Sequence, residues 1–120
     1  MGQIENFQQL EVWQKGHQLA LAVYRVTKGF PADEKFGLVV QMRRAAVSVP
    51  ANIAEGFKRR GQADKMRFYN TSETSLEELK YYFILSRDLE YITDTEQLIA
   101  DAETVSRMLY RLIESINSRR

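Results

Sequence analysis

Apolar residues recur at helical spacing in four separate stretches of this sequence, and no strand-like alternation of apolar and polar residues is sustained anywhere. Only two prolines and six glycines interrupt the 120 residues. Because these residue types are the strongest breakers of helices, their scarcity favours long helices. The pattern therefore predicts an all-α chain with four helices, at about residues 10–28, 33–59, 63–89 and 93–117.

Local sequence signals mark the ends of these stretches. Gly29 and Pro31 favour an end to the first helix, because glycine readily terminates a helix and proline cannot continue one. Asp33 and Glu34 place negative charge at the start of the second helix, where the helix dipole favours it. Residues 93–96, with the sequence TDTE, match a capping box and predict the start of the fourth helix.

Pro50 lies inside the second stretch, so either one helix kinks there or two helices abut. The apolar spacing continues across the proline, which favours a single kinked helix. All connections between the stretches are short, and short connections make successive helices antiparallel neighbours. We therefore expect residues 1–120 to form one domain, an antiparallel up-and-down four-helix bundle whose second helix is kinked at Pro50.

Composition argues against several classes of function. The chain has no cysteine, which excludes disulfides, thiolate metal sites and cysteine nucleophiles. Its one histidine, His17, shares a face with Trp13 and has no nucleophile or orienting carboxylate nearby in the sequence, so we expect it at the edge of the core. No signal-peptide pattern and no apolar run of membrane-spanning length is present. We expect a cytoplasmic protein that is not an enzyme and uses no metal or cofactor.

The third stretch carries more apolar surface than one bundle helix needs. A heptad seam with three serines runs along it, and small residues let helices approach closely: Phe68, Ser72, Ser75, Leu79, Tyr82, Ser86 and Leu89. A second stripe, Met66, Tyr69, Leu76 and Phe83, lies on an adjoining face. Surplus aromatic surface is typical of an interface, although tyrosine is also stable when half covered at a surface. We expect a homo-oligomer whose interface includes Tyr69, Tyr81, Tyr82 and Phe83.

Polar residues are concentrated in the second stretch, where they suit two different roles. Arg44 and Glu55 share a helix face but lie about three turns apart, so each is expected to meet a partner on another helix. Glu78 is the expected partner of an arginine. We favour a partly buried ion-pair network that fixes helix register over a pocket for a small ligand. The cluster comprises Gln41, Arg43, Arg44, Asn52, Glu55 and Glu78.

A basic segment surrounds the turn between the second and third stretches, and Asp64 is the one acidic residue among residues 57–67. Cations at a helix C-terminus are favoured by the dipole alone, which would make this a solvated turn. The same cations could also contact phosphates, and symmetry in an oligomer would multiply them. The candidate nucleic-acid-binding residues are Lys58, Arg59, Arg60, Lys65 and Arg67, and Arg119 and Arg120 add charge at the chain end.

Several motifs resemble those of the 23S rRNA intervening-sequence proteins. They are LEVWQK at 10–15, RRAA at 43–46, SVPANIAEG at 48–56 and SLEEL at 75–79, and the resemblance extends over roughly residues 7–115. It implies a four-helix bundle that assembles into a ring-shaped homo-oligomer, a pentamer, with no established enzymatic activity. Family members are often encoded within insertions in bacterial 23S rRNA genes. A related group, the accessory proteins of diversity-generating retroelements, binds nucleic acid and a reverse transcriptase.

The sequence departs from this pattern at five positions, where small residues are usual in the family. Gly16 stands where the family usually has alanine, Ser72 and Ser86 where it often has alanine, and Thr74 and Glu90 where it often has glycine. These changes leave the predicted fold intact and affect its fine packing.

Three functional hypotheses follow. The first is a non-enzymatic homo-oligomer that binds structured RNA, such as rRNA, or a ribonucleoprotein through the basic segment. The alternative is a protein-interaction scaffold that docks a partner, such as a reverse-transcriptase-like enzyme, without direct RNA readout. The third is a site for a small anion at Arg43, Arg44 and Glu55.

Overall fold

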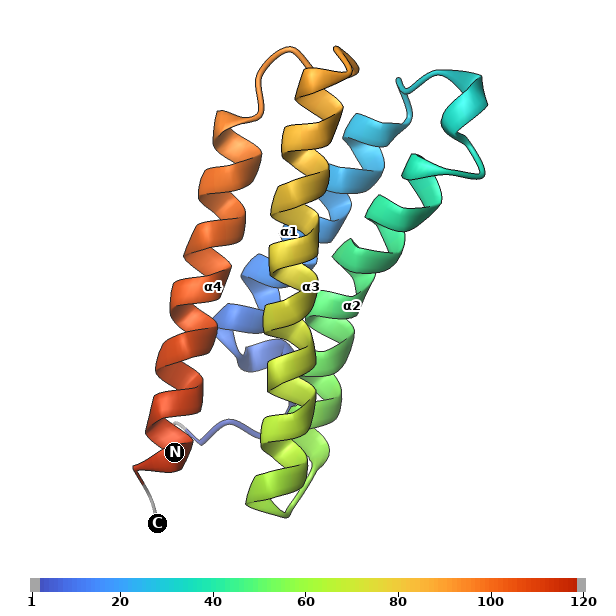
Figure 1. Cartoon of the computed structure of the whole chain (residues 1–120). Helices are drawn as coiled ribbons and strands as arrows, with labels where there is room; N and C mark the ends of the chain where they lie inside the picture. The colour runs from blue at the N-terminus through green and yellow to red at the C-terminus, as the bar shows by residue number, and fades with distance from the viewer. Residues whose placement is uncertain (1–2, 119–120) are drawn as a thin grey trace.

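The computed structural model describes residues 3–118 and contains four long helices in them. Successive helices run in opposite directions, which gives an up-and-down bundle of 47 × 24 × 23 Å (Figure 1). The predicted all-α four-helix bundle is confirmed. Its elements are the 3₁₀ turn η1 (Phe7–Gln9), α1 (Glu11–Thr27), the 3₁₀ turn η2 (Ala32–Glu34), α2 (Leu38–Lys58), α3 (Gln62–Asp88) and α4 (Glu96–Asn117).

All four helices contribute to one continuous core. Each places fully or nearly fully buried aliphatic side chains along the bundle axis, including Val23, Met42, Ile53, Leu79 and Leu109. These positions follow the apolar periodicity of the sequence, because residues three and four apart lie on one helix face. None of the described helices is long and apolar enough to cross a membrane.

Two aromatic residues that we expected at an oligomer interface lie instead in the core of the single chain. Tyr69 and Phe83 are 1% and 0% exposed, whereas Tyr81 is exposed and Tyr82 is half-buried. The physical reason is that α3 packs against both α2 and α4, so most of both apolar stripes is covered within the bundle, although Leu89 at the end of one stripe is exposed. The second stripe is therefore not surplus surface.

The second helix begins later than predicted. Residues 32–34 form the separate turn η2, and α2 starts at Leu38. Glu34 explains the boundary, since its Oε1 accepts the Leu38 amide at 3.2 Å and its Oε2 accepts the Tyr91 hydroxyl at 2.8 Å. The carboxylate thus caps α2 from outside the helix, and the hydrogen bond to it raises the pKa of Tyr91.

Two further boundary predictions have different outcomes. α2 runs through Pro50 as one helix, as expected, and the kink at that residue stays a prediction. The capping box predicted for residues 93–96 does not form, because α4 begins only at Glu96. There the Oδ1 of Asp94 accepts the Glu96 amide at 2.9 Å, a shorter-range cap than the one the sequence indicated.

The seam serines of α3 form polar contacts with α2. The buried Ser72 hydroxyl donates to the Val49 carbonyl at 2.8 Å, directly before Pro50. Ser75 donates to the Ser48 hydroxyl at 2.7 Å. Small side chains let the two helix backbones approach, and their hydroxyls find partners across the interface or in the preceding turn, which removes the cost of burying them.

The closest approach of α2 to α3 lies at Gly56, where the Tyr69 ring packs against the glycine backbone. A Cβ atom at Gly56 would lie 2.5 Å from Cε1 and 2.8 Å from Cδ1 of Tyr69. Burial in this contact raises the pKa of Tyr69 to about 12. Glycine is therefore required here for space.

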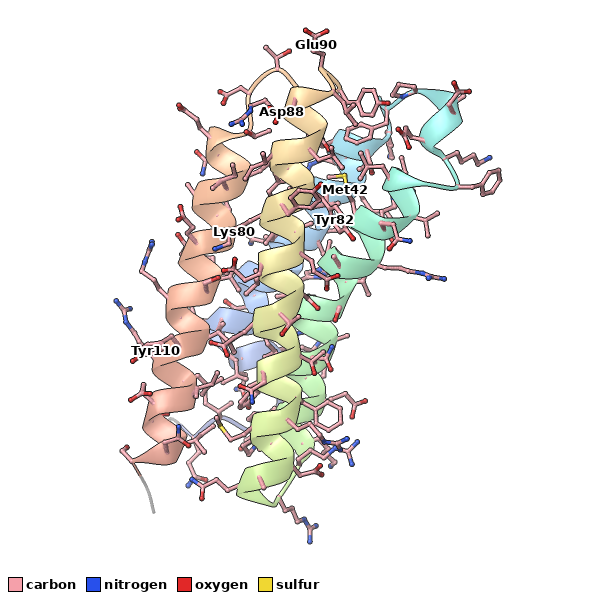
Figure 2. The ribbon with its side chains drawn as sticks, in the orientation of Figure 1. Met42, Lys80, Tyr82, Asp88, Glu90 and Tyr110 are labelled. Atoms are coloured by element: carbon pink, nitrogen blue, oxygen red, sulfur yellow. The ribbon has the colours of Figure 1, made fainter. Side chains whose placement is uncertain are left out.

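Helix α3 ends in a Schellman motif at the top of the bundle (Figure 2). The Tyr91 amide donates to the Ser86 carbonyl at 2.8 Å, and the Glu90 amide donates to the Arg87 carbonyl at 2.9 Å. This motif needs a left-handed residue, and Glu90 supplies it with φ of 67°. A glutamate in this conformation carries a steric cost that glycine does not.

We predict that Gly56→Ala lowers the free energy of unfolding by about 1–3 kcal/mol, because the added methyl group overpacks the Tyr69 contact. Chemical denaturation followed by circular dichroism measures the change. Gly29→Ala is the matched control, since its Cβ would come no closer than 3.8 Å to Val26 O. Equal stability of the two variants would show that the Tyr69 contact is not restrictive.

We predict the opposite sign at the α3–α4 turn. Glu90→Gly should raise the free energy of unfolding by about 1 kcal/mol, because it relieves the left-handed strain. Glu90→Ala removes the same charge but keeps the Cβ, so it should give no comparable gain. A similar gain in both variants would assign the effect to charge rather than to backbone conformation.

Candidate nucleic-acid interface

The basic segment forms the tight turn between α2 and α3, at one end of the bundle (Figure 1). The Arg59 amide closes α2 by donating to the carbonyls of Glu55 and Gly56, both at 3.3 Å. Cations here complement the negative end of the α2 dipole, and Asp64 in the first turn of α3 complements the positive end of the next helix. The end of α4 lies beside the turn, where Gln62 donates to the Ile116 carbonyl. Arg119 and Arg120 lie outside the described residues.

The five candidate cations fall into three groups, of which the first is Lys65 alone. Its Nζ donates to the carbonyls of Gly56 at 2.7 Å and Phe57 at 3.0 Å, in the last turn of α2. It also lies 5.7 Å from the Phe57 ring centroid and 5.9 Å from that of Tyr69. Lys65 thus caps α2 from α3, and its charge is directed into the protein rather than toward a ligand.

The second group is Arg59 and Arg67, which share the carboxylate of Asp64. Arg67 pairs with Asp64 at 2.7 Å, and Arg59 lies 3.9 Å from Asp64 and 3.1 Å from Glu55. Both guanidinium groups also lie over the Phe68 ring, at 4.7 and 4.9 Å from its centroid. Periodicity placed Phe68 in the heptad seam of α3, whereas its ring is half-buried and holds two arginines. An aromatic residue within a basic segment is a recognisable signal of nucleic-acid binding.

Lys58 and Arg60 form the third group. Both are exposed, and within residues 3–118 neither forms an ion pair, a side-chain hydrogen bond or a cation–π contact. Their charges are therefore available to a polyanion. Of the five residues predicted from the sequence, these two are the ones best placed to contact phosphates.

The expected buried ion-pair network in α2 does not form. Arg43 donates from Nε to Thr27 Oγ1 at 2.9 Å and stacks over the Tyr24 ring at 4.5 Å, while Asn52 donates to the Ser48 carbonyl at 2.8 Å. Glu55 pairs with Arg59 of the same region. Among the described side chains, the other members have no ion pair and are exposed: Gln41, Arg44 and Glu78. The reason is that Gln41 and Arg44 lie on the exposed face of α2 and Glu78 lies on the exposed face of α3.

Part of this polar cluster lines an open groove instead. The groove lies along α1 and α2, has a volume of about 590 Å³, and is bordered by Tyr24, Val40, Arg43, Arg44, Val47, Ser48 and Asn52. Valines supply apolar surface, and Arg44 supplies a charge that forms no ion pair with the described side chains. Such a mixed surface suits a protein contact better than a small anion, for which two arginines on an open face give little enclosure.

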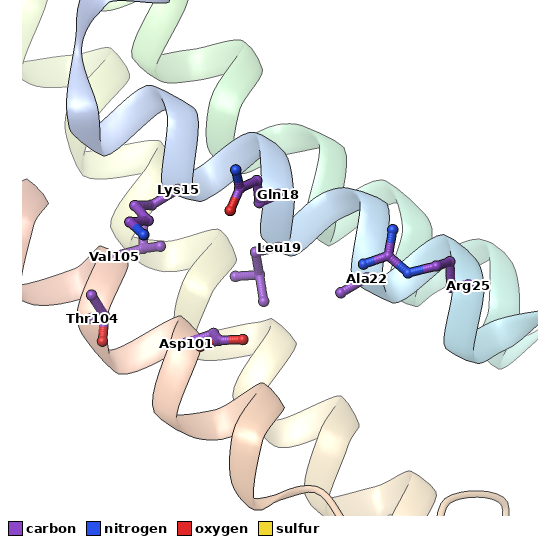
Figure 3. Close-up of a pocket in the computed structure, with 8 residues that line it drawn as sticks. All are labelled: Lys15, Gln18, Leu19, Ala22, Arg25, Asp101, Thr104 and Val105. Carbon is purple, nitrogen blue, oxygen red and sulfur yellow. The ribbon is translucent and has the colours of Figure 1, made fainter.

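A second, more enclosed hollow lies between α1 and α4 and has a volume of about 310 Å³ (Figure 3). Leu19 and Val105 lie in it beside the cations Lys15 and Arg25 of α1. Asp101 of α4 accepts a hydrogen bond from Gln97 at 2.8 Å. The hollow brings together side chains from opposite ends of the chain, so the sequence carried no signal for it.

His17 is exposed rather than at the core edge, and it stacks on Trp13 with ring centroids 5.0 Å apart and planes inclined by 9°. No cluster of three or more histidine, aspartate or glutamate side chains suited to a metal ion occurs in the described part of the chain. The observed geometry offers surfaces for binding.

Comparison with known proteins agrees with this architecture. Residues 8–111 match the family model described as 23S rRNA-intervening sequence protein. The comparison with curated proteins gives no match. A similar solved structure is a protein with unknown function from the S23 ribosomal protein family of Bacteroides thetaiotaomicron, which is 25% identical, with a TM-score of 0.79 over 85% of this chain and 97% of that chain. On the extent of the family match, this chain belongs to the 23S rRNA-intervening sequence protein family.

Proposed function

We propose that this protein is a non-catalytic homo-oligomer that binds structured RNA through the turn between α2 and α3. The observation that carries the proposal is the pair Lys58 and Arg60, two exposed cations at the end of the bundle that have no carboxylate partner within residues 3–118. Family membership supports an RNA target, since the family takes its description from 23S rRNA.

Charge is distributed unevenly along the bundle in a way that supports end-on binding. Residues 55–67 hold five cations and two carboxylates, a net charge of about +3, whereas the whole chain has +1. The rest of the chain therefore carries about −2. A polyanion is attracted to the turn and repelled by much of the remaining surface, which orients the protein on RNA.

We assign self-association to the open groove along α1 and α2 described above. Val47 there is 44% exposed, and Leu21 and Tyr24 are exposed large side chains of α1. Exposed apolar side chains gathered with an unpaired arginine are typical of protein interfaces. A ring of five copies, as the family resemblance implies, would repeat the basic turn five times.

The alternative, a scaffold that docks a partner protein, has less support from the structure than it had from the sequence. It rested on an aromatic face of α3, and only Tyr81 and Tyr82 of its four residues reach the surface. We therefore place RNA binding first.

We predict that Lys58→Gln/Arg60→Gln weakens binding to a labelled 23S rRNA hairpin and flattens its salt dependence. Loss of two phosphate contacts should reduce the slope of log K against log salt concentration by about 2 for each bound turn. Fluorescence anisotropy at several salt concentrations measures both. Lys28→Gln/Lys35→Gln is the control, because it removes the same charge at the opposite end of the bundle. Equal losses of RNA affinity in both variants would show that net charge, rather than the position of Lys58 and Arg60, controls binding.

We predict that the wild-type protein elutes as an assembly of about five times the 14.0 kDa subunit mass. Light scattering coupled to size exclusion measures the mass. Val47→Glu should lower it, because a carboxylate in the groove costs desolvation at the interface. Tyr81→Glu places the same charge on α3 and should leave the mass unchanged. Dissociation of the Tyr81 variant alone would move the interface to α3, and a monomeric wild type would refute the assembly.

A further inference from the structure

The basic turn contains a preformed stack in which one aromatic ring holds two guanidinium groups. Phe68 is half-buried at the start of α3, with the guanidinium carbons of Arg59 and Arg67 at 4.7 and 4.9 Å from its ring centroid. Arg59 comes from the turn and Arg67 from α3, so the two arginines approach the ring from different elements. The contacts restrain both side chains before any ligand arrives.

Carboxylates restrain the same two arginines further. Asp64 pairs with Arg67 at 2.7 Å and lies 3.9 Å from Arg59, which also pairs with Glu55 at 3.1 Å. The side chains of Arg67 and Arg59 nevertheless stay 69% and 42% exposed. Their charge is partly neutralised, and a phosphate that approached them would also meet Asp64. Arg59 and Arg67 are therefore poor phosphate ligands, although their side chains remain partly exposed.

We propose that the turn selects unpaired RNA nucleotides, with a base stacked on the guanidinium groups of Arg59 and Arg67 and the adjacent phosphates bound by Lys58 and Arg60. Planar guanidinium groups stack on unpaired bases, which a duplex keeps inside its own stack. Prior restraint by Phe68, Asp64 and Glu55 lowers the entropy lost on binding. The inference rests on the proposed function and names the substrate class of that site: RNA loops, bulges and single strands.

Because only Lys58 and Arg60 are assigned to phosphates, we expect a small electrostatic contribution to the binding free energy. Lys65 caps α2, and Arg59 and Arg67 are paired with carboxylates, so we expect each turn to contact about two phosphates rather than five. For a single strand this corresponds to a slope of log K against log salt concentration of about −1.4 for each bound turn. The base itself must supply the remaining affinity.

The test compares a single-stranded RNA of about 10 nucleotides, within the length that a single-strand site covers, with an abasic strand of the same length and charge. Fluorescence anisotropy with the full-length protein measures both. We expect the base-bearing strand to bind about tenfold more tightly, the scale of one base stack. Arg59→Lys/Arg67→Lys keeps both charges but removes the planar groups, so it should lose most of this preference while binding the abasic strand as the wild type does.

The possible results separate the inference from the function on which it rests. Equal affinity of the wild type for base-bearing and abasic strands would overturn base stacking and leave backbone binding intact. Preference for a duplex of the same length would also overturn it. An unchanged preference in the double lysine variant would remove Arg59 and Arg67 from the site. Failure to bind any of the strands at low salt would overturn the proposed function together with the inference.

Discussion

The contact between the Tyr69 ring and the Gly56 backbone determines how the basic end of this bundle is built. Tyr69 lies about two turns into α3 and Gly56 lies in the last turn of α2, so their contact fixes the distance at which the two helices leave the core. Lys65 then spans the same gap and caps the Gly56 and Phe57 carbonyls. A connection of only three residues can therefore join the helices, which gives the cations of the turn a fixed base.

The same close packing of α2 on α3 explains why sequence periodicity predicted the fold but misplaced two aromatic residues. Spacing of apolar residues specifies which side of a helix is buried, and that information was enough for four antiparallel helices. It does not specify how wide the covered arc is, because that depends on how closely the neighbouring helices approach. Serine at positions 72, 75 and 86 permits a close approach, so α3 buries most of both stripes, including Tyr69 and Phe83.

Charge patterns in the sequence located the basic turn but not the different roles of its residues. Composition alone revealed five cations around residues 58–67, whereas the capping role of Lys65 depends on a reach back across the turn. The pair Glu55–Arg59 was accessible from the sequence, since residues four apart meet on a helix surface. The long-range partner expected for Glu55 was unnecessary for that reason. Arg44 and Glu55 do share a face, but that face is exposed to solvent and has no need of a buried network.

Assembly and RNA binding are coupled if both proposals hold, because cyclic symmetry brings every basic turn to the same rim of a ring. Like charges on one rim repel one another over the Debye length of about 8 Å at physiological ionic strength. RNA that spans several turns neutralises this repulsion, and each added contact benefits from the effective concentration set by the first. Thermodynamic linkage then requires reciprocity: RNA favours the ring to the same extent that the ring favours RNA. Two cations in each subunit are enough for such a design, since the affinity comes from avidity among several weak sites rather than from a single strong site.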